Sequence, residues 1–233
     1  MSNLKHNGEL RWSPSYLRRQ GKVTPAQKRA LRDNWNRFGI EFRYGDKISL
    51  NDHFSSSDGP LHLEIGFGMG ENLIYQAKTV PDSRILGIEV HKPGIGAALK
   101  KIEEEQLQNI RVMRGDARLI LSDYLDESTR FDQISVLFPD PWPDPENAHR
   151  RIIQTDLIEL FARKIRHHGH LHIASDVDLY RDHVESVMAH HNAWKRITDF
   201  EITSLRGPTR YETRGLEMGH RIHDLYFQFD PCS

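Results

Sequence analysis

The sequence predicts an α/β fold with a seven-stranded, mostly parallel sheet, helices on both faces and an antiparallel closing pair of strands. From Leu61 onward, short apolar runs alternate with segments whose apolar residues recur at helical spacing. This alternation is typical of crossover units in a parallel sheet. Near the end of the chain, two apolar runs flank a loop without a convincing helix, which favours an antiparallel pair over another crossover.

Each predicted strand is a short apolar run. The five crossover strands are "LHLEI" (61–65), "RILGIEV" (84–90), "IRVMR" (110–114), "QISVLF" (133–138) and "HLHIAS" (170–175), and the closing pair is "EITSL" (201–205) with "HDLYFQF" (223–229). Helical spacing between the strands is shown by Ile95, Leu99 and Ile102, by Ile153, Leu157, Leu160 and Phe161, and by Val184, Val187 and Met188. These segments predict helices that cover the sheet.

The first part of the chain has its own helix signal and its own charge. Thr24 is a good N-cap, Pro25 suits the first helical position, and Gln27 completes a capping box, so a helix to about Phe38 is expected. The cluster "FSSSDGP" (54–60) then separates an arm, residues 1–57, from a domain, residues 58–233. Residues 1–35 carry eight Lys or Arg against two acids, whereas the rest carries 24 against 31. A basic arm on an acidic body predicts contact with a polyanion, although alone it fits a solvated tail.

The composition predicts a cytoplasmic globular protein. Hydrophobic residues make up 37% and charged residues 28%, which is ordinary for a globular protein. No apolar stretch is long enough to cross a bilayer, and residues 1–10 lack the pattern of a signal peptide. The single cysteine, Cys232, excludes an internal disulfide.

Three glycines follow the first strand at alternate positions. Gly66, Gly68 and Gly70 leave room for a backbone turn and for a ligand lying against it. A dinucleotide-binding turn has the spacing G-x-G-x-x-G or its alanine variant, but here the sixth position is Glu71. A carboxylate at a helix start is a poor neighbour for a pyrophosphate. With Glu64 before the glycines, the turn suits a cationic ligand better.

Acidic residues end or follow the first three strands. Glu64 precedes the glycines, Glu89 ends the next strand where an acid can accept ribose hydroxyls, and Asp116 follows the third strand, where it can meet an adenine edge. Any one of them could be a solvated loop start. Together they fit S-adenosylmethionine, an adenosine with a sulfonium and a cationic amine, better than NAD.

The fourth strand runs into "LFPDPWPDP" (137–145). Asp140 lies between Pro139 and Pro141, whose rings restrict the backbone, and Trp142 offers a flat apolar face. A rigid proline loop with a packed tryptophan would explain the motif without a function. Its position after the fourth strand favours a functional interpretation.

These motifs occur together in one known family. "LEIGFGMGENL", "LGIEVHKPGIGAAL", "RGDA", "FPDPW", "HIASD" and "TRYETRG", in this order, resemble the bacterial tRNA (guanine-N7-)-methyltransferases, and "SYLRRQGKVTPAQKRAL" (15–31) is similar to their basic amino-terminal segment. The resemblance implies a Rossmann-like class I methyltransferase that uses S-adenosylmethionine to methylate a guanosine in the tRNA variable loop. It further implies that Glu64, Glu89, Asp116 and Asp140 line the cofactor site with the glycines, that Asp140 is catalytic, and that Asp176 and Thr209, Arg210, Tyr211 and Glu212 meet the substrate.

One position departs from this pattern. The family carries a lysine two residues beyond the Trp of the Pro-Asp-Pro-Trp loop, whereas this chain has Asp144 there, and the later basic run is reduced to Arg150 and Arg151. An acid near a phosphate path is expected to weaken RNA docking. A divergent paralogue that acts on another RNA, and a non-catalytic RNA-binding protein that retains the cofactor pocket, therefore remain alternatives, as does an NAD-dependent oxidoreductase.

The histidines do not predict a metal site. The stretch "RHHGHLH" (166–172) places His170 and His172 on one strand face, but no Cys or carboxylate completes a ligand set in a chain with 14 histidines. His91 after Glu89 is expected to pack beside the site rather than act as a base. No membrane or obligate protein partner is indicated, and both a monomer and a homodimer fit the sequence.

Overall fold

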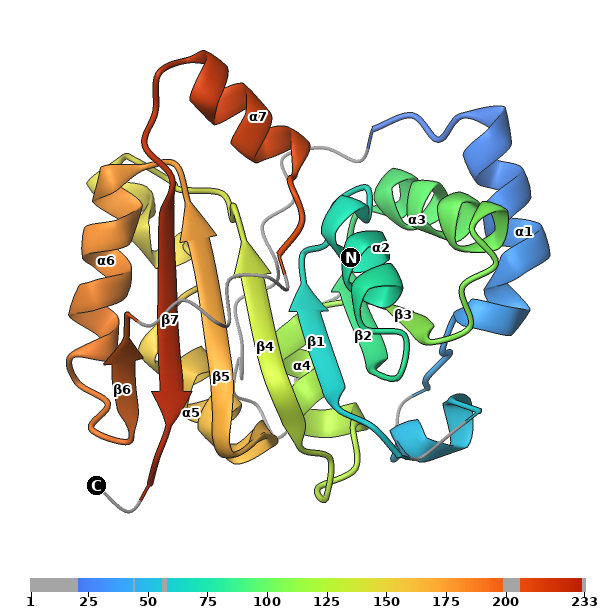
Figure 1. The fold of residues 1–233 in the computed structure, drawn as a ribbon, viewed down its shortest axis with the longest axis horizontal. Helices are drawn as coiled ribbons and strands as arrows, with labels where there is room; N and C mark the ends of the chain where they lie inside the picture. Colours follow the sequence, from blue (N-terminus) through green and yellow to red (C-terminus); the bar gives the residue numbers. More distant parts are fainter. Residues whose placement is uncertain (1–20, 44, 56–57, 199–205, 232–233) are drawn as a thin grey trace.

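A seven-stranded sheet forms the centre of the molecule, with strand order β3-β2-β1-β4-β5-β7-β6 (Figure 1). The computed structural model describes residues 21–43, 45–55, 58–198 and 206–231. The strands are β1 Leu61–Ile65, β2 Arg84–Glu89, β3 Ile110–Arg114, β4 Phe131–Leu137, β5 Ile165–Ser175, β6 Trp194–Ile197 and β7 His223–Phe229. β1 to β5 pair in parallel, and β7 lies antiparallel between β5 and β6. The predicted fold class is confirmed.

Helices and short turns of helix connect these strands (Figure 1). They are α1 Pro25–Phe38, η1 Leu50–His53, α2 Glu71–Thr79, α3 Lys92–Glu104, α4 Ala117–Leu119, η2 Ile120–Tyr124, η3 Pro145–Arg150, α5 Thr155–Lys164, α6 Asp178–Met188 and α7 Arg210–Glu217. Within the described ranges, none of these helices has the length and apolar character needed to cross a membrane.

The sheet separates two hydrophobic cores. Neighbouring residues of a strand point to opposite faces, and Val112 and Met113 of β3 accordingly belong to different cores. One core holds apolar residues of α1, α2 and α3, and the other holds those of α5 and α6. β1 and β2 are buried along their whole length, as expected for central strands of a parallel sheet covered on both faces.

The first helix begins as predicted and packs on the body. Thr24 Oγ accepts a hydrogen bond from the Gln27 amide at 3.3 Å, and the Gln27 side chain accepts one from the Thr24 amide at 2.9 Å. α1 lies against α3, where Gly96 permits the approach: a Cβ there would lie 2.8 Å from Gln27 Cβ. After the helix, Gly39 bridges to Val112 of β3, so this segment follows the edge of the sheet.

The carboxyl-terminal region corrects two details. The loop before β7 contains a helix, α7, so the prediction of a loop without a helix is wrong. The edge strand that pairs with β7 is β6, whereas the predicted strand at 201–205 lies outside the described residues. α7 has one buried residue, Gly215, and therefore lacks the apolar periodicity that reveals longer helices.

Candidate active site

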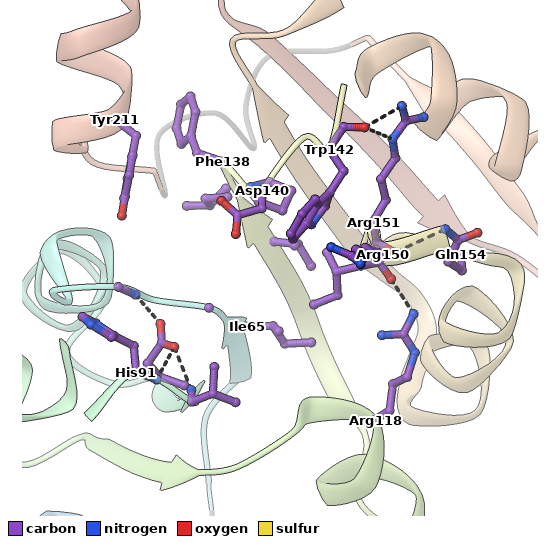
Figure 2. Close-up of a pocket in the computed structure, with 18 of the residues that line it drawn as sticks. Ile65, His91, Arg118, Phe138, Asp140, Trp142, Arg150, Arg151, Gln154 and Tyr211 are labelled. Atoms are coloured by element: carbon purple, nitrogen blue, oxygen red, sulfur yellow. Dashed lines mark hydrogen bonds between the residues drawn. The ribbon is translucent and has the colours of Figure 1, made fainter. Parts of the chain in front are cut away.

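A cavity of about 750 Å³ opens at the carboxyl ends of β1, β2 and β4 (Figure 2). This edge of an open α/β sheet is where ligands bind, next to the point where strand order reverses. Of the residues predicted as site residues, those lining the cavity are Gly66, Gly68, Glu89, Asp140, Arg210 and Tyr211. Glu64, Gly70, Asp116, Asp176, Thr209 and Glu212 do not line it.

The glycine turn forms one wall of the cavity. Gly66, Gly68 and Gly70 have φ of +72°, +58° and +83°, a backbone conformation that side chains disfavour. A Cβ on Gly66 would meet nothing within 4 Å, so the space beside it is open. Gly70 instead allows helix packing, since its Cβ would lie 2.8 Å from Ala98 Cβ in α3. Two glycines thus face the ligand space and the third brings two helices together.

Glu89 joins the glycine turn to the end of β2. Its carboxylate accepts hydrogen bonds from the backbone amides of Gly68 at 2.8 Å, Val90 at 2.7 Å and His91 at 2.8 Å (Figure 2). An ionised carboxylate has about four acceptor positions, so one remains beyond these three bonds. The side chain is thereby fixed with an acceptor available at the cavity.

Glu64 lies behind the cavity wall. It is buried, and Asn72 Nδ2 donates to Glu64 Oε2 at 3.0 Å. The Asn72 side chain in turn accepts a hydrogen bond from the Gly207 amide at 3.0 Å. Burial raises the pKa of Glu64 to about 8; the Asn72 hydrogen bond opposes this rise, and the negative charges of Glu71 and Glu89 add to it. Glu64 therefore connects the glycine turn to the segment that leads into α7.

Asp116 caps the helix that follows β3. Its side chain accepts from the amides of Arg118 at 2.8 Å and Leu119 at 3.4 Å. Arg118, two residues on, reaches the cavity and donates to the Ile152 carbonyl at 2.8 Å (Figure 2). The structure thus places Asp116 at the start of α4, whereas Arg118, two residues later, lines the cavity.

The loop that carries Asp140 has a strained backbone at both ends. Phe138 and Trp142 have φ of +48° and +40°, and such non-glycine residues cluster at functional sites because the surrounding structure must hold them. Arg151 helps to stabilise this loop, because its guanidinium donates hydrogen bonds to the carbonyls of Pro141 and Trp142, each at 3.0 Å. Asp140 is exposed between them and lines the cavity.

α7 forms the opposite side of the opening. Tyr211 is 44% exposed, and its ring lies 3.7 Å from where a Cβ of Gly68 would be. Thr209 and Glu212 form a capping box, and Glu212 is also paired with Arg206 at 2.6 Å. Asp176 contacts the segment that follows α7 through His220, with Nδ1 and Oδ2 2.9 Å apart.

Several residues of the site were not predicted. Arg118 and Arg206 have partners distant in sequence, Ile152 and Asp224, and Arg151 bonds the Trp142 carbonyl across a loop, so no local motif reveals them. The α7 start had a signal, because Thr209 and Glu212 show the spacing T-x-x-E of a capping box.

Asp144 has a defined local function. It is the N-cap of η3, where its carboxylate accepts from the Glu146 amide at 3.0 Å and from Asn147 Nδ2 at 3.1 Å. η3 ends at Arg150, whose guanidinium lies 5.0 Å from the centre of the Trp142 ring. The acid at this position thus begins the turn that carries Arg150 to the tryptophan.

Two histidines of β5 contact residues of the neighbouring strand β7. His172 Nε2 lies 2.7 Å from Asp224 Oδ1, and His170 Nε2 lies 3.3 Å from Gln228 Nε2. Over the described part of the chain, no group of three His, Cys, Asp or Glu residues could hold a metal ion.

Charge is divided across the cavity. Figure 2 shows Arg118, Arg150 and Arg151 on one side and His91 on the other, and the His91 amide donates to the Glu89 carboxylate. Asp140 lies between these regions. One half suits a cationic adenosine ligand, and the other suits a polyanion.

Comparisons with known proteins agree with this geometry. Residues 58–225 match the family described as "Putative methyltransferase". The chain is 39% identical over 214 residues to the tRNA (guanine-N(7)-)-methyltransferase of Nitrosococcus oceani, covering 92% of this chain and 89% of that protein. It is 35% identical over 223 residues to the protein of that name from Pseudoalteromonas atlantica, covering 94% and 92%.

Solved structures show the same fold at low identity. TrmN from Thermus thermophilus matches 87% of this chain and 48% of its own, with a TM-score of 0.51 and 13% identity. A SAM-dependent methyltransferase from Aquifex aeolicus matches 77% and 87%, with a TM-score of 0.50 and 15% identity. Together with the motifs in the cavity wall, the sequence matches show that the chain belongs to the tRNA (guanine-N(7)-)-methyltransferase family.

Proposed function

We propose that this protein transfers the methyl group of S-adenosylmethionine to N7 of a guanosine in tRNA, in the variable loop as the resemblance implies. The single observation that carries the proposal is that Asp140 and the glycine wall line the same cavity. A cytoplasmic location follows from the tRNA substrate. The cofactor supplies an electrophilic methyl group on a positively charged sulfur.

The residues of the glycine wall fit this cofactor. The space beside Gly66 is open, Glu89 retains an acceptor for a ribose hydroxyl, and Ile65, Val90 and Leu137 supply apolar walls. Glu64, Gly70 and Asp116 support this half from behind: Glu64 through Asn72, Gly70 through packing on α3, and Asp116 by capping α4. We assign them to the cofactor site as positioning residues.

Two aromatic residues flank the space for the target base. Figure 2 shows Asp140 between Tyr211 on α7 and Trp142. A guanosine inside folded RNA must leave its stack to enter a cavity, and aromatic faces compensate for the lost stacking. Tyr211 and Trp142 are the surfaces on which the base would stack.

Asp140 acts on charge rather than on a proton. Guanine N7 uses its in-plane lone pair to form the new bond, and the electrons of the broken carbon–sulfur bond remain on sulfur, so no general base is needed. The purine becomes positively charged, and a fixed carboxylate stabilises that charge as it develops. Holding N7 in line with the methyl group contributes roughly 7–11 kcal/mol by orientation.

The other predicted substrate residues act at the border of the cavity. Arg210 and Arg150 line it and can contact phosphates, which supply most of the affinity for RNA. Thr209 and Glu212 set the start of α7 and thereby the position of Tyr211. Asp176 supports the same helix, since a Cβ on Gly215 would lie 2.9 Å from Asp176 Oδ2.

The test is methyl transfer from labelled S-adenosylmethionine to unmodified tRNA transcripts, followed by nucleoside analysis. The proposal predicts label in 7-methylguanosine alone. Label in another nucleoside, or binding of S-adenosylhomocysteine without transfer to any tRNA, would overturn it and favour the divergent or non-catalytic alternatives.

A further inference from the structure

A second cavity, of about 530 Å³, lies beside the active site at the β3 edge of the sheet. Its lining includes Trp35, Phe42, Val90, Lys92, Arg114 and Gly115. Val90 also lines the active-site cavity, and its neighbours His91 and Lys92 face the first and the second cavity respectively. The two cavities are thus adjacent along three consecutive residues.

The aromatic wall of the second cavity is fixed by its own contacts. The Trp35 indole donates a hydrogen bond to the Glu41 carboxylate. Phe42 packs against Tyr124 with ring centres 4.5 Å apart, and a Cβ on Gly115 would lie 3.1 Å from the Phe42 ring. Two aromatic side chains are therefore held at this cavity without further ordering on binding.

The same cavity carries two cations at its rim. Lys92 and Arg114 are exposed, and neither has a salt bridge to a residue in the described ranges. Glu41, the acid of the lining, accepts the indole N–H of Trp35 through Oε1, so the two cations outnumber a single carboxylate that is already hydrogen-bonded. A pair of cations beside aromatic faces matches the chemistry of a nucleotide, because phosphates attract the cations and the base stacks on the rings.

We propose that this second cavity binds a further nucleotide of the tRNA substrate, with its phosphate on Lys92 and Arg114 and its base against Trp35 and Phe42. The inference rests on the proposed function, since it identifies a second point at which the same RNA is held. A volume of 530 Å³ is within the range of small-ligand pockets. The site would fix the direction of the RNA that leaves the active site.

The double variant Lys92→Ala/Arg114→Ala tests the site. Loss of two phosphate contacts should weaken tRNA binding about 10- to 30-fold near 0.15 M salt and reduce the slope of log Kd against log salt by about 2. The KM for tRNA should rise to match, whereas kcat should stay within about twofold because neither side chain lines the active-site cavity. S-adenosylhomocysteine affinity should be unchanged.

The matched control is Lys101→Ala/Arg163→Ala, which removes the same charge from exposed positions on α3 and α5. If the control weakens tRNA binding as much as the test variant, the loss results from the removal of two positive charges from the protein rather than from this cavity, and the proposal is wrong. It is also wrong if the test variant loses S-adenosylhomocysteine affinity, or if it changes the monomer–dimer equilibrium in sedimentation and leaves tRNA affinity intact. The charge-free, longer variant Lys92→Gln/Arg114→Gln must give the same loss as the alanine variant.

Equilibrium binding separates this inference from the proposed function, because it needs no methyl transfer. If wild-type protein methylates tRNA and the variant binds tRNA like the control, the second site is rejected and the function stands. If wild-type protein binds tRNA but transfers no methyl group, the binding comparison still decides the site. A photo-cross-link from 4-thiouridine-containing tRNA to the peptide spanning residues 35–42 should appear with wild-type protein and decrease in the variant.

Discussion

Arg206 and Glu212 form a two-contact ion pair, with Nη1 2.6 Å from Oε2 and Nη2 2.7 Å from Oε1. Both side chains are largely buried, at 11% and 17% exposure. The Arg206 guanidinium also pairs with Asp224 at 3.0 Å and lies 5.8 Å from the centre of the Phe138 ring. This arginine therefore links α7, the sheet and the loop that carries Asp140.

Arg206→Ala should destabilise the protein and disturb the active site. Removing one partner of a buried pair leaves an uncompensated charge and costs about 3–5 kcal/mol. We expect urea unfolding to show a decrease of that size in the free energy of unfolding. We also expect kcat to fall by a larger factor than the affinity for the cofactor. The control is Arg214→Ala, an exposed arginine of α7, expected within about 0.5 kcal/mol of wild type. Equal effects of the two substitutions would contradict a specific function for Arg206.

Glu64 should make stability depend on pH. Its pKa is raised by burial from 4.5 to about 8, so between these values the folded protein keeps a proton that the unfolded chain has released. The free energy of unfolding should therefore fall as pH rises from 4.5 to 8, by on the order of 3–5 kcal/mol. Glu64→Gln keeps an acceptor for Asn72 and removes the titration, so its stability relative to wild type should increase over this window. A constant difference between pH 5 and pH 9 would refute the assignment.

Substitutions of Asp144 can separate the effect of its negative charge on RNA binding from its function as the N-cap of η3. Asp144→Asn retains an N-cap oxygen and removes the negative charge, so η3 should persist while tRNA binding tightens about two- to fivefold at 0.1 M salt. Asp144→Ala removes both features and is the matched comparison. Filter binding across a salt series measures the effect. Weaker binding by the asparagine variant would show that the carboxylate itself serves the RNA.

Asp140→Ala should separate binding from chemistry. We expect kcat to fall by at least about 100-fold, because a carboxylate aimed at the developing charge is lost. S-adenosylhomocysteine affinity, measured by calorimetry, should remain within a fewfold, since Glu89 and the glycine wall are unchanged. Asp156→Ala, a second exposed acid of the same cavity, controls for loss of negative charge. Retention of full activity by Asp140→Ala would eliminate its catalytic assignment.

The features that could be predicted from the sequence are those that depend on neighbouring residues. The glycine turn, the end of β2 at Glu89 and the capping box of α1 all follow from neighbouring residues, and the structure has them at the predicted positions. Proximity to a strand end did not show whether a side chain faces the ligand. Glu64 and Asp116 occupy the predicted ends, but their carboxylates are hydrogen-bonded to Asn72 and to the α4 amides and do not line the cavity.

The remaining features depend on contacts between distant residues. Arg206 acquires its function from Asp224, and Arg151 from carbonyls on the other side of a loop, so neither has a sequence motif. α7 is short and mostly exposed, and its capping box was interpreted as a substrate motif alone. β6 has four residues, too few for a clear alternation.

The central claim is that guanine N7 in tRNA accepts the methyl group, and replacing that atom tests it most directly. Two tRNA transcripts should be compared with labelled S-adenosylmethionine, one with guanosine and one with 7-deazaguanosine throughout, with equal binding of both verified first. The account predicts label in the guanosine transcript and none in the 7-deaza transcript. Equal label in both would show that another atom accepts the methyl group.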